Sequence, residues 1–157
     1  MTIILIFLAT VLIIAEIASA SKIKGILKLA ARVPVMCTFV AISSVNFGSY
    51  IGTETNSTGA MTVNCVLGAN YAISLGTGGS GTYNSRHMNN IGEWLIYNLY
   101  TDNTHSTIWG NGTGGSVIVN GTGTGSDQNY SIYGRILAGQ YVPVGSYADN
   151  VVITIDY

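Results

Sequence analysis

Short runs in which apolar and polar residues alternate recur along most of this chain of 157 residues. Alternation with a period of two is typical of β-strands that bury one face. After the first twenty residues, clusters of Gly, Asn and Ser separate these runs, and no long helical pattern follows. The pattern predicts an all-β domain, a sandwich or barrel of short strands. We expect strands at 38–42, 61–65, 71–75, 95–100, 117–119, 130–136 and 151–157, with turns or loops at 52–59, 76–81, 110–115 and 121–126.

Residues 21–35 alternate as well, but they precede the body that begins at the first cysteine. One face of this arm is apolar or small and the other is cationic. The first face comprises Ile23, Gly25, Leu27, Leu29, Ala31 and Val33, and the second carries Lys22, Lys24, Lys28 and Arg32. This alternation favours a strand made for a neighbouring molecule. Because Lys24, Lys28 and Arg32 also lie at helical spacing, an amphipathic helix remains the alternative.

Residues 1–20 have the composition of a secretory signal. An apolar run at 3–14 is followed by Ala18–Ala20, a small-x-small cleavage site. No Lys or Arg precedes the run and Lys22 follows it, so an uncleaved anchor is the alternative. The run is shorter than the about 20 apolar residues that a spanning helix needs. We therefore expect cleavage after Ala20 and export.

Charged residues are few and unevenly placed. They make up 8% of the chain, and the arm holds four positive charges. Two arginines against six acidic residues leave the rest of the mature chain with a net charge of −4. Opposite charges of this kind would steer copies into head-to-tail association. Alternatively, lysines on an exposed edge strand prevent wrong pairing.

Cys37 and Cys65 are the two cysteines, and they predict one disulfide. An even number of cysteines in an exported chain favours a structural disulfide. Closing a loop of about thirty residues would contribute about 3–4 kcal/mol through chain entropy. No CxxC spacing occurs, so we expect no zinc site and no cofactor.

Two Gly-rich segments, 76–81 and 110–115, match the G-x-G-x-x-G pattern of nucleotide-binding loops. Neither precedes a helical pattern, which that motif requires. His87, His105 and the scattered acids form no catalytic constellation. We therefore expect no enzyme and no nucleic-acid partner.

Trp94 and Trp109, together with the Tyr-rich loops, support an alternative function. Aromatic side chains of this kind can stack on sugars, although in a sandwich they more often pack in the core or at its rim. The alternative is a secreted or membrane-anchored glycan-binding β-sandwich.

A series of motifs runs in order from Cys37 to the last residue. It comprises Asn46-Phe47-Gly48-x-Tyr50, Val63-Asn64-Cys65, Tyr71-x-Ile73-x-Leu75, Leu95-x-Tyr97-x-Leu99-Tyr100-x-Asp102, Thr107-Ile108-Trp109-Gly110-x-Gly112, Tyr133-Gly134-Arg135-Ile136 and Gly145-x-Tyr147-x-Asp149. Together these motifs resemble the spore coat protein U domain, the subunit fold of archaic, Csu-type chaperone–usher pili.

The resemblance implies a pilin with an incomplete immunoglobulin-like sandwich. In that family a periplasmic chaperone fills the groove with its own strand, and at the outer-membrane usher the arm of the next subunit replaces it by donor-strand exchange. Cys37 and Cys65 would be the family's disulfide. The donor strand would be Ile23, Gly25, Leu27, Leu29 and Ala31, and the groove edge and chaperone contact would be Val151, Ile153, Ile155 and Tyr157. The lysine-rich arm departs from the more neutral arms expected of the family, which leaves its register open.

Three parts are therefore expected: the signal peptide at 1–20 and, from the resemblance, a donor-strand arm at 21–35 and a pilin domain at 36–157. The last predicted strand runs to the final residue, which leaves the sandwich an open edge. The expected function is a structural pilin that is exported to the periplasm and polymerises into an extracellular fibre for adhesion or biofilm formation. Its expected partners are other subunits, a periplasmic chaperone and an outer-membrane usher.

Overall fold

The computed structural model describes residues 21–157. Its contacts divide the chain into two units, one ending at Arg32 and a body from Val33 to Tyr157. Residues 21–36 form neither helix nor strand by themselves, and their side chains are exposed. The helical alternative is therefore not formed in the single chain. The predicted signal peptide at 1–20 lies outside the described residues.

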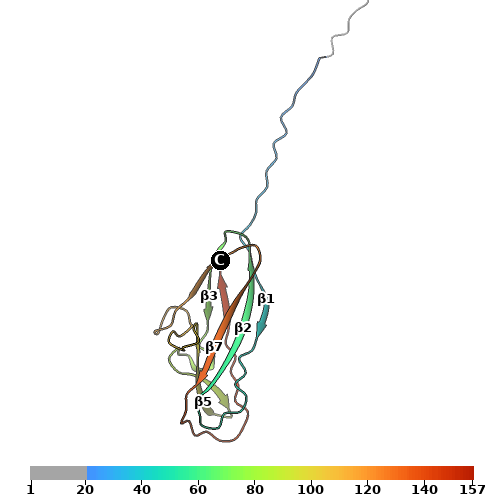
Figure 1. Ribbon diagram of the computed structural model, residues 1–157. Coiled ribbons are helices and arrows are strands. Elements are labelled where there is room, and N and C mark those ends of the chain that lie inside the picture. Colours follow the sequence, from blue (N-terminus) through green and yellow to red (C-terminus); the bar gives the residue numbers. More distant parts are fainter. Residues whose placement is uncertain (1–20) are drawn as a thin grey trace, which may run out of the picture. The chain divides into compact units, whose positions relative to one another are not determined.

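Eight strands in two sheets build the body (Figure 1). A five-stranded sheet contains, in order, β1 (Cys37–Ser43), β2 (Thr55–Cys65), β7 (Asp127–Ile136), β5 (Glu93–Tyr100) and β4 (Arg86–Asn90). A three-stranded sheet contains β6 (Val119–Thr122), β3 (Asn70–Leu75) and β8 (Ile153–Asp156). Paired strands run antiparallel throughout, and one short 3-10 turn, η1 (Gly78–Ser80), completes the regular structure of the described part. The predicted all-β fold class is confirmed.

The core lies between the two sheets and follows the predicted alternation. In β3, Tyr71, Ile73 and Leu75 are buried, whereas the residues between them face outward. Trp109 is only 1% exposed, and its Nε1 donates a hydrogen bond to the Ile73 carbonyl at 3.0 Å. A buried ring with a satisfied N–H is a core residue, so Trp109 is unavailable for sugar stacking.

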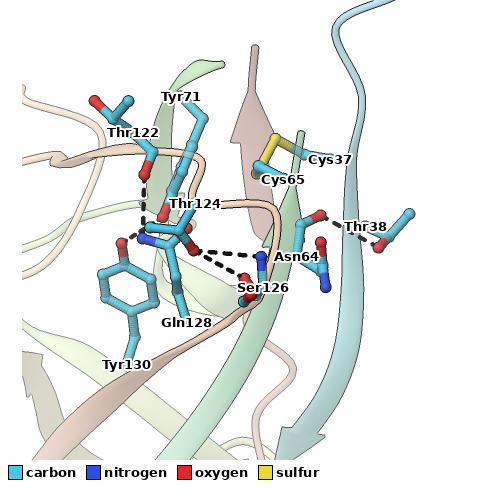
Figure 2. Close-up of a disulfide and its surroundings, with 10 residues drawn as sticks. All are labelled: Cys37, Thr38, Asn64, Cys65, Tyr71, Thr122, Thr124, Ser126, Gln128 and Tyr130. Carbon is cyan, nitrogen blue, oxygen red and sulfur yellow. Dashed lines mark hydrogen bonds between the residues drawn. A yellow bond between two sulfur atoms is a disulfide. The ribbon is translucent and has the colours of Figure 1, made fainter. Parts of the chain in front are cut away.

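The disulfide between Cys37 and Cys65 joins the first residue of β1 to the last residue of β2 (Figure 2). This pairing confirms the prediction. The two cysteines lie directly opposite each other in the antiparallel ladder, and the Thr38 hydroxyl donates to the Asn64 carbonyl at 3.4 Å. The disulfide therefore ties the start of the edge strand to its sheet.

Some local predictions are wrong. Residues 52–59 were expected to form a loop, but β2 begins at Thr55, because its polar half pairs in register with β7 from Thr55 opposite Ile136. The short strand expected at 117–119 is β6, at Val119–Thr122, where Gly121 leaves room for the Tyr71 ring. His87 lies in β4, a strand that the alternation pattern did not predict.

Candidate functional site: a groove between the first and last strands

β1 and β8 are both edge strands. Within residues 21–157, β1 pairs with β2 alone and β8 pairs with β3 alone. Phe39 and Ile42 of β1 are 40% and 55% exposed, although both are large apolar residues. An edge strand with unpaired backbone groups and exposed apolar side chains is a template for another strand.

A groove runs between two segments that are far apart in the sequence, 42–50 and 142–153. Two adjoining hollows of about 460 Å³ and about 760 Å³ form it. Both hollows are lined by Val45, Phe47 and Asp149, so they lie side by side. The floor of the smaller hollow is apolar and consists of Leu75, Met88, Tyr97, Leu99 and Ile132.

The first wall of the groove, residues 42–50, packs onto a glycine of β7. A Cβ placed on Gly134 would lie 2.6 Å from Val45 Cγ1 and 2.8 Å from Phe47 Cζ. The wall can approach β7 this closely only because Gly134 has no side chain. The Phe47 ring meets the Tyr97 ring edge-on, with centroids 6.1 Å apart. Wall and floor therefore form one packed unit.

The Asn46-Phe47-Gly48-x-Tyr50 motif fixes the far end of this wall. Asn46 Oδ1 accepts a hydrogen bond from the Gly48 N–H at 2.9 Å, in a turn where Gly48 has φ +66°. Such a φ is accessible to glycine at little cost. The Tyr50 hydroxyl donates to the Leu137 carbonyl at 2.8 Å and accepts from the Gln140 N–H at 3.0 Å. The motif therefore fixes the conformation of the chain at this end of the groove.

Asp149 fixes the second wall of the groove, residues 142–150, through hydrogen bonds. Its carboxylate accepts hydrogen bonds from the Tyr97 hydroxyl at 2.7 Å, the Gly79 N–H at 2.9 Å and the Asn150 N–H at 2.8 Å. Burial of the phenol and this hydrogen bond raise the pKa of Tyr97 far above its usual value. Tyr97 therefore remains a neutral donor that connects the groove floor to the wall.

Arg86 is fully buried next to this network. Its Nε and Nη2 donate to the Gly76 carbonyl at 3.0 and 2.8 Å, and Nη2 also donates to the Trp109 carbonyl at 2.7 Å. Nη1 donates to Asn98 Oδ1 at 2.7 Å, and the Tyr83 ring lies 5.2 Å from the guanidinium carbon. Burial lowers the pKa of Arg86. The guanidinium therefore links the backbone at Gly76 and Trp109 to the Asn98 side chain of β5. No sequence pattern indicated this role.

The predicted groove residues of the last strand occupy three environments. Val151 and Ile153 line the groove, and Ile155 packs against the core beside them. Tyr157 is 59% exposed and lines a different hollow, on the outer side of β3 and β8. Their roles as chaperone contacts stay predictions. Sequence patterns missed the 142–150 wall, because this irregular segment has no alternation to detect.

The donor residues Ile23, Gly25, Leu27, Leu29 and Ala31 all lie in the exposed arm. The single chain holds no second copy for them to contact, so their insertion into a groove stays a prediction. The exposed fractions of Ile23, Leu27 and Leu29 are 95%, 82% and 85%.

Two further kinds of site are absent from the part of the chain that the structure describes. No helix at 21–157 is long and apolar enough to cross a membrane. Over the same range, no three His, Cys, Asp or Glu side chains gather where they could hold a metal ion. The Gly-rich segments at 76–81 and 110–115 lie in turns and lead into no α-helix.

The fold and the groove define a class: an immunoglobulin-like β-sandwich that lacks a strand between its first and last strands. The chain belongs to the Spore Coat Protein U domain family, whose model matches residues 23–154. The resemblance seen in the motifs is thereby confirmed. Proteins of this family are structural, which agrees with the expectation that the chain is not an enzyme.

Two known proteins illustrate the relationship. "Protein U" of Myxococcus xanthus is 32% identical over 130 residues, which cover 73% of this chain and 72% of the relative. The fold is also similar to a crystal structure of the CsuC–CsuE chaperone–tip adhesion subunit pre-assembly complex, from archaic chaperone–usher Csu pili of Acinetobacter baumannii. That match has a TM-score of 0.58 at 23% identity. It covers 80% of this chain but 40% of the matched chain, so the present chain spans less than half of its length.

Proposed function

We propose that this protein is a structural pilus subunit that accepts a donated strand in its groove and donates its own arm, residues 21–35, to a neighbouring copy. The observation that carries the proposal is the open groove with an apolar floor between 42–50 and 142–153. Both of its borders end in edge strands with free backbone groups, so an extra strand would find hydrogen-bond partners and a place for its side chains.

The energetics favour insertion of the arm. Ile23, Leu27 and Leu29 are almost fully exposed in the single chain, so each would gain from burial. Burying four or five apolar side chains at about 1.5–3 kcal/mol each gives on the order of 10 kcal/mol before costs. A ladder of backbone hydrogen bonds adds to this. No nucleotide is needed, because completing the sandwich supplies the free energy.

The arm is long enough for this role. At about 3.3 Å per residue, a dozen extended residues span about 40 Å, roughly the length of a small sandwich domain. Gly25 would sit where the groove has room for little more than backbone, or where the strand bends. The absence of helix and strand at 21–36 in the single chain supports a segment that takes its structure from a partner.

Before assembly the groove needs a temporary occupant, since an open edge of this kind promotes aggregation. A periplasmic chaperone would supply that strand, and an outer-membrane usher would catalyse its replacement by the next subunit's arm. The similarity to a subunit solved with its chaperone supports this route. The protein would then be exported and displayed on the cell surface as a fibre that serves adhesion or biofilm formation.

One observation favours the second candidate, a glycan-binding module. Trp94 is 59% exposed and stacks on His87, with ring centroids 4.6 Å apart. An exposed aromatic platform of this kind can hold a sugar ring. With Trp109 in the core, this candidate rests on one tryptophan. A monomer that binds sugars without polymerising would support it.

The test is a denaturing gel of surface material from cells that express the protein with a chaperone and an usher, with boiled and unboiled samples side by side. We expect a ladder of multimers that collapses to monomer on boiling, because strands exchanged into a core dissociate slowly at ambient temperature. Monomer in both lanes would refute polymerisation by strand exchange and favour the glycan-binding module.

A further inference from the structure

We propose that Asp156 of one copy forms a cross-strand ion pair with Lys24 of the arm donated by the next copy, and that this pair sets the register of the donated strand. The inference rests on the proposed function. It adds the residue that decides which of several possible alignments the arm adopts.

β8 and the two residues before it present two different faces to an incoming strand. Val151, Ile153 and Ile155 point inward, whereas Val152, Thr154 and Asp156 are exposed on the outer face. An arm beside β8 would alternate in the same way. With its apolar residues in the groove, its lysines lie on the face that carries Asp156, so opposite charges meet across the strands.

Asp156 is the acid on the strand beside which the arm would lie. Asp149 holds the groove wall, Asp127 accepts a hydrogen bond from Asn64 Nδ2 at 2.8 Å, and Asp102 accepts several from its own turn. The Asp156 side chain is exposed. It is also the one acidic residue in β8.

The outer face beside Asp156 is hollow. Ala72 lies opposite Asp156 in one ladder and opposite Asn120 in the other. Because Ala72 is small, a hollow opens over it, lined also by Asn70 and Tyr157. A lysine side chain from a strand beside β8 can lie next to Asp156, where the carboxylate and the Tyr157 ring are able to receive an ammonium group.

The direction of the arm follows from the rest of the body. Paired strands of the described sheets all run antiparallel. Antiparallel ladders are also slightly more stable per residue than parallel ones. An arm antiparallel to β8 would place residues 21–24 near Asp156 and later residues near Val151.

The positions of the apolar residues in the arm decide which lysine faces Asp156. With Lys24 opposite Asp156, Leu27 lies beside Ile153 and Leu29 beside Val151, so both leucines enter the apolar part of the groove. Moving Lys22 opposite Asp156 would instead put Gly25 beside Ile153 and Leu29 beside the Asp149 carboxylate. That register would fill the apolar hollow with the smallest residue and bury a leucine against charge.

Charge exchange tests the pair in the full-length chain, expressed with chaperone and usher. Cross-strand ion pairs of about 0.2–1 kcal/mol correspond to about 1.4- to fivefold in an equilibrium. Asp156→Lys should lower the yield of heat-sensitive multimers at least by this factor, since like charges then face each other. Adding Lys24→Asp should restore the yield, whereas adding Lys28→Asp should not. Asp127→Asn serves as the control for loss of an acid elsewhere and should leave assembly unchanged.

Cysteine cross-linking reads the register directly. The double variant Lys24→Cys/Asp156→Cys should form a disulfide between copies, because only residues with Cα atoms within about 7 Å can be bridged. The ladder should then survive boiling and collapse on reduction. The matched pairs Lys22→Cys/Asp156→Cys and Lys28→Cys/Asp156→Cys should cross-link much less.

The outcomes separate the two proposals. If the unmodified chain forms no heat-sensitive multimers, the proposed function fails. If it forms them while Asp156→Lys assembles normally, or while cross-links form through residue 22 or 28, the function stands and the Lys24–Asp156 register is refuted.

Discussion

Val45 lies directly over Gly134, with its Cγ1 only 2.6 Å from the point where a side chain on Gly134 would begin. This contact lets the segment after β1 turn inward and become the first wall of the groove. The same segment carries Phe47, which reaches the floor at Tyr97. The groove therefore depends on a missing side chain in the middle of β7.

Gly134→Ala should lower the free energy of unfolding by about 1–3 kcal/mol, the usual cost of overpacking. The added methyl would displace Val45 and Phe47, since both lie within 3 Å of it. Urea unfolding of the purified variants measures the loss. Gly79→Ala is the matched control, because its nearest atom is Asp149 Oδ1 at 3.5 Å, and it should cost less than about 0.5 kcal/mol. Equal stability of the two variants would contradict this role of Gly134.

Arg86→Met should destabilise the body by about 3 kcal/mol or more. The change leaves the Gly76 and Trp109 carbonyls without their donors, and a buried acceptor without a partner costs about 1–3 kcal/mol. Arg135→Met is the comparison, since that guanidinium lies 5.1 Å from the Tyr100 ring at a half-buried site and its loss should cost about 1 kcal/mol. Similar unfolding midpoints for both variants would show that Arg86 does not hold the loops together.

Alkaline pH should destabilise the fold through Tyr97. Its pKa is raised in the folded state, so the folded protein holds this proton more tightly than the unfolded chain, whose tyrosines titrate at about pH 10. The contribution to stability is fully present below pH about 10 and is lost as the pH rises toward the folded pKa. Thermal unfolding from pH 8 to 11.5 measures the decline.

Tyr97→Phe is the variant for this pH series. It should cost about 1 kcal/mol at pH 7, because the Asp149 hydrogen bond is lost, and it should weaken the alkaline decline. Tyr71, whose pKa burial also raises, would account for part of the remainder. An unchanged slope in Tyr97→Phe would show that another group is responsible.

The sequence predicted the parts of the fold that rest on local pattern. β3, β5 and β7 alternate visibly, and the two cysteines pair as expected. β4 was not predicted because its buried residue, Arg86, is charged and so gives no apolar alternation. In the fold the Arg86 guanidinium donates hydrogen bonds to the Gly76 and Trp109 carbonyls, which allows its burial.

The groove was only partly predictable from the sequence. Val151 and Ile153 belong to an alternating strand, and the structure places them in the lining. The facing wall depends on Gly134 and Val45, which meet only after β7 and the segment following β1 come together. The arm fits both the strand and the helix periodicity, and in the single chain it is exposed and forms neither element.

Paired aspartate substitutions in the arm test the central claim most directly. In a strand Leu27 faces the groove and Ile26 faces away, whereas in a helix the two neighbours lie on the same apolar face. The measurement is the unboiled gel of surface material, with the chaperone-bound subunit as the control for folding. Leu27→Asp should abolish the multimers while Ile26→Asp retains them, and both variants should still be recovered with the chaperone. Equal loss, or no loss, in the two variants would contradict a strand that inserts Ile23, Gly25, Leu27, Leu29 and Ala31 into a neighbour's groove.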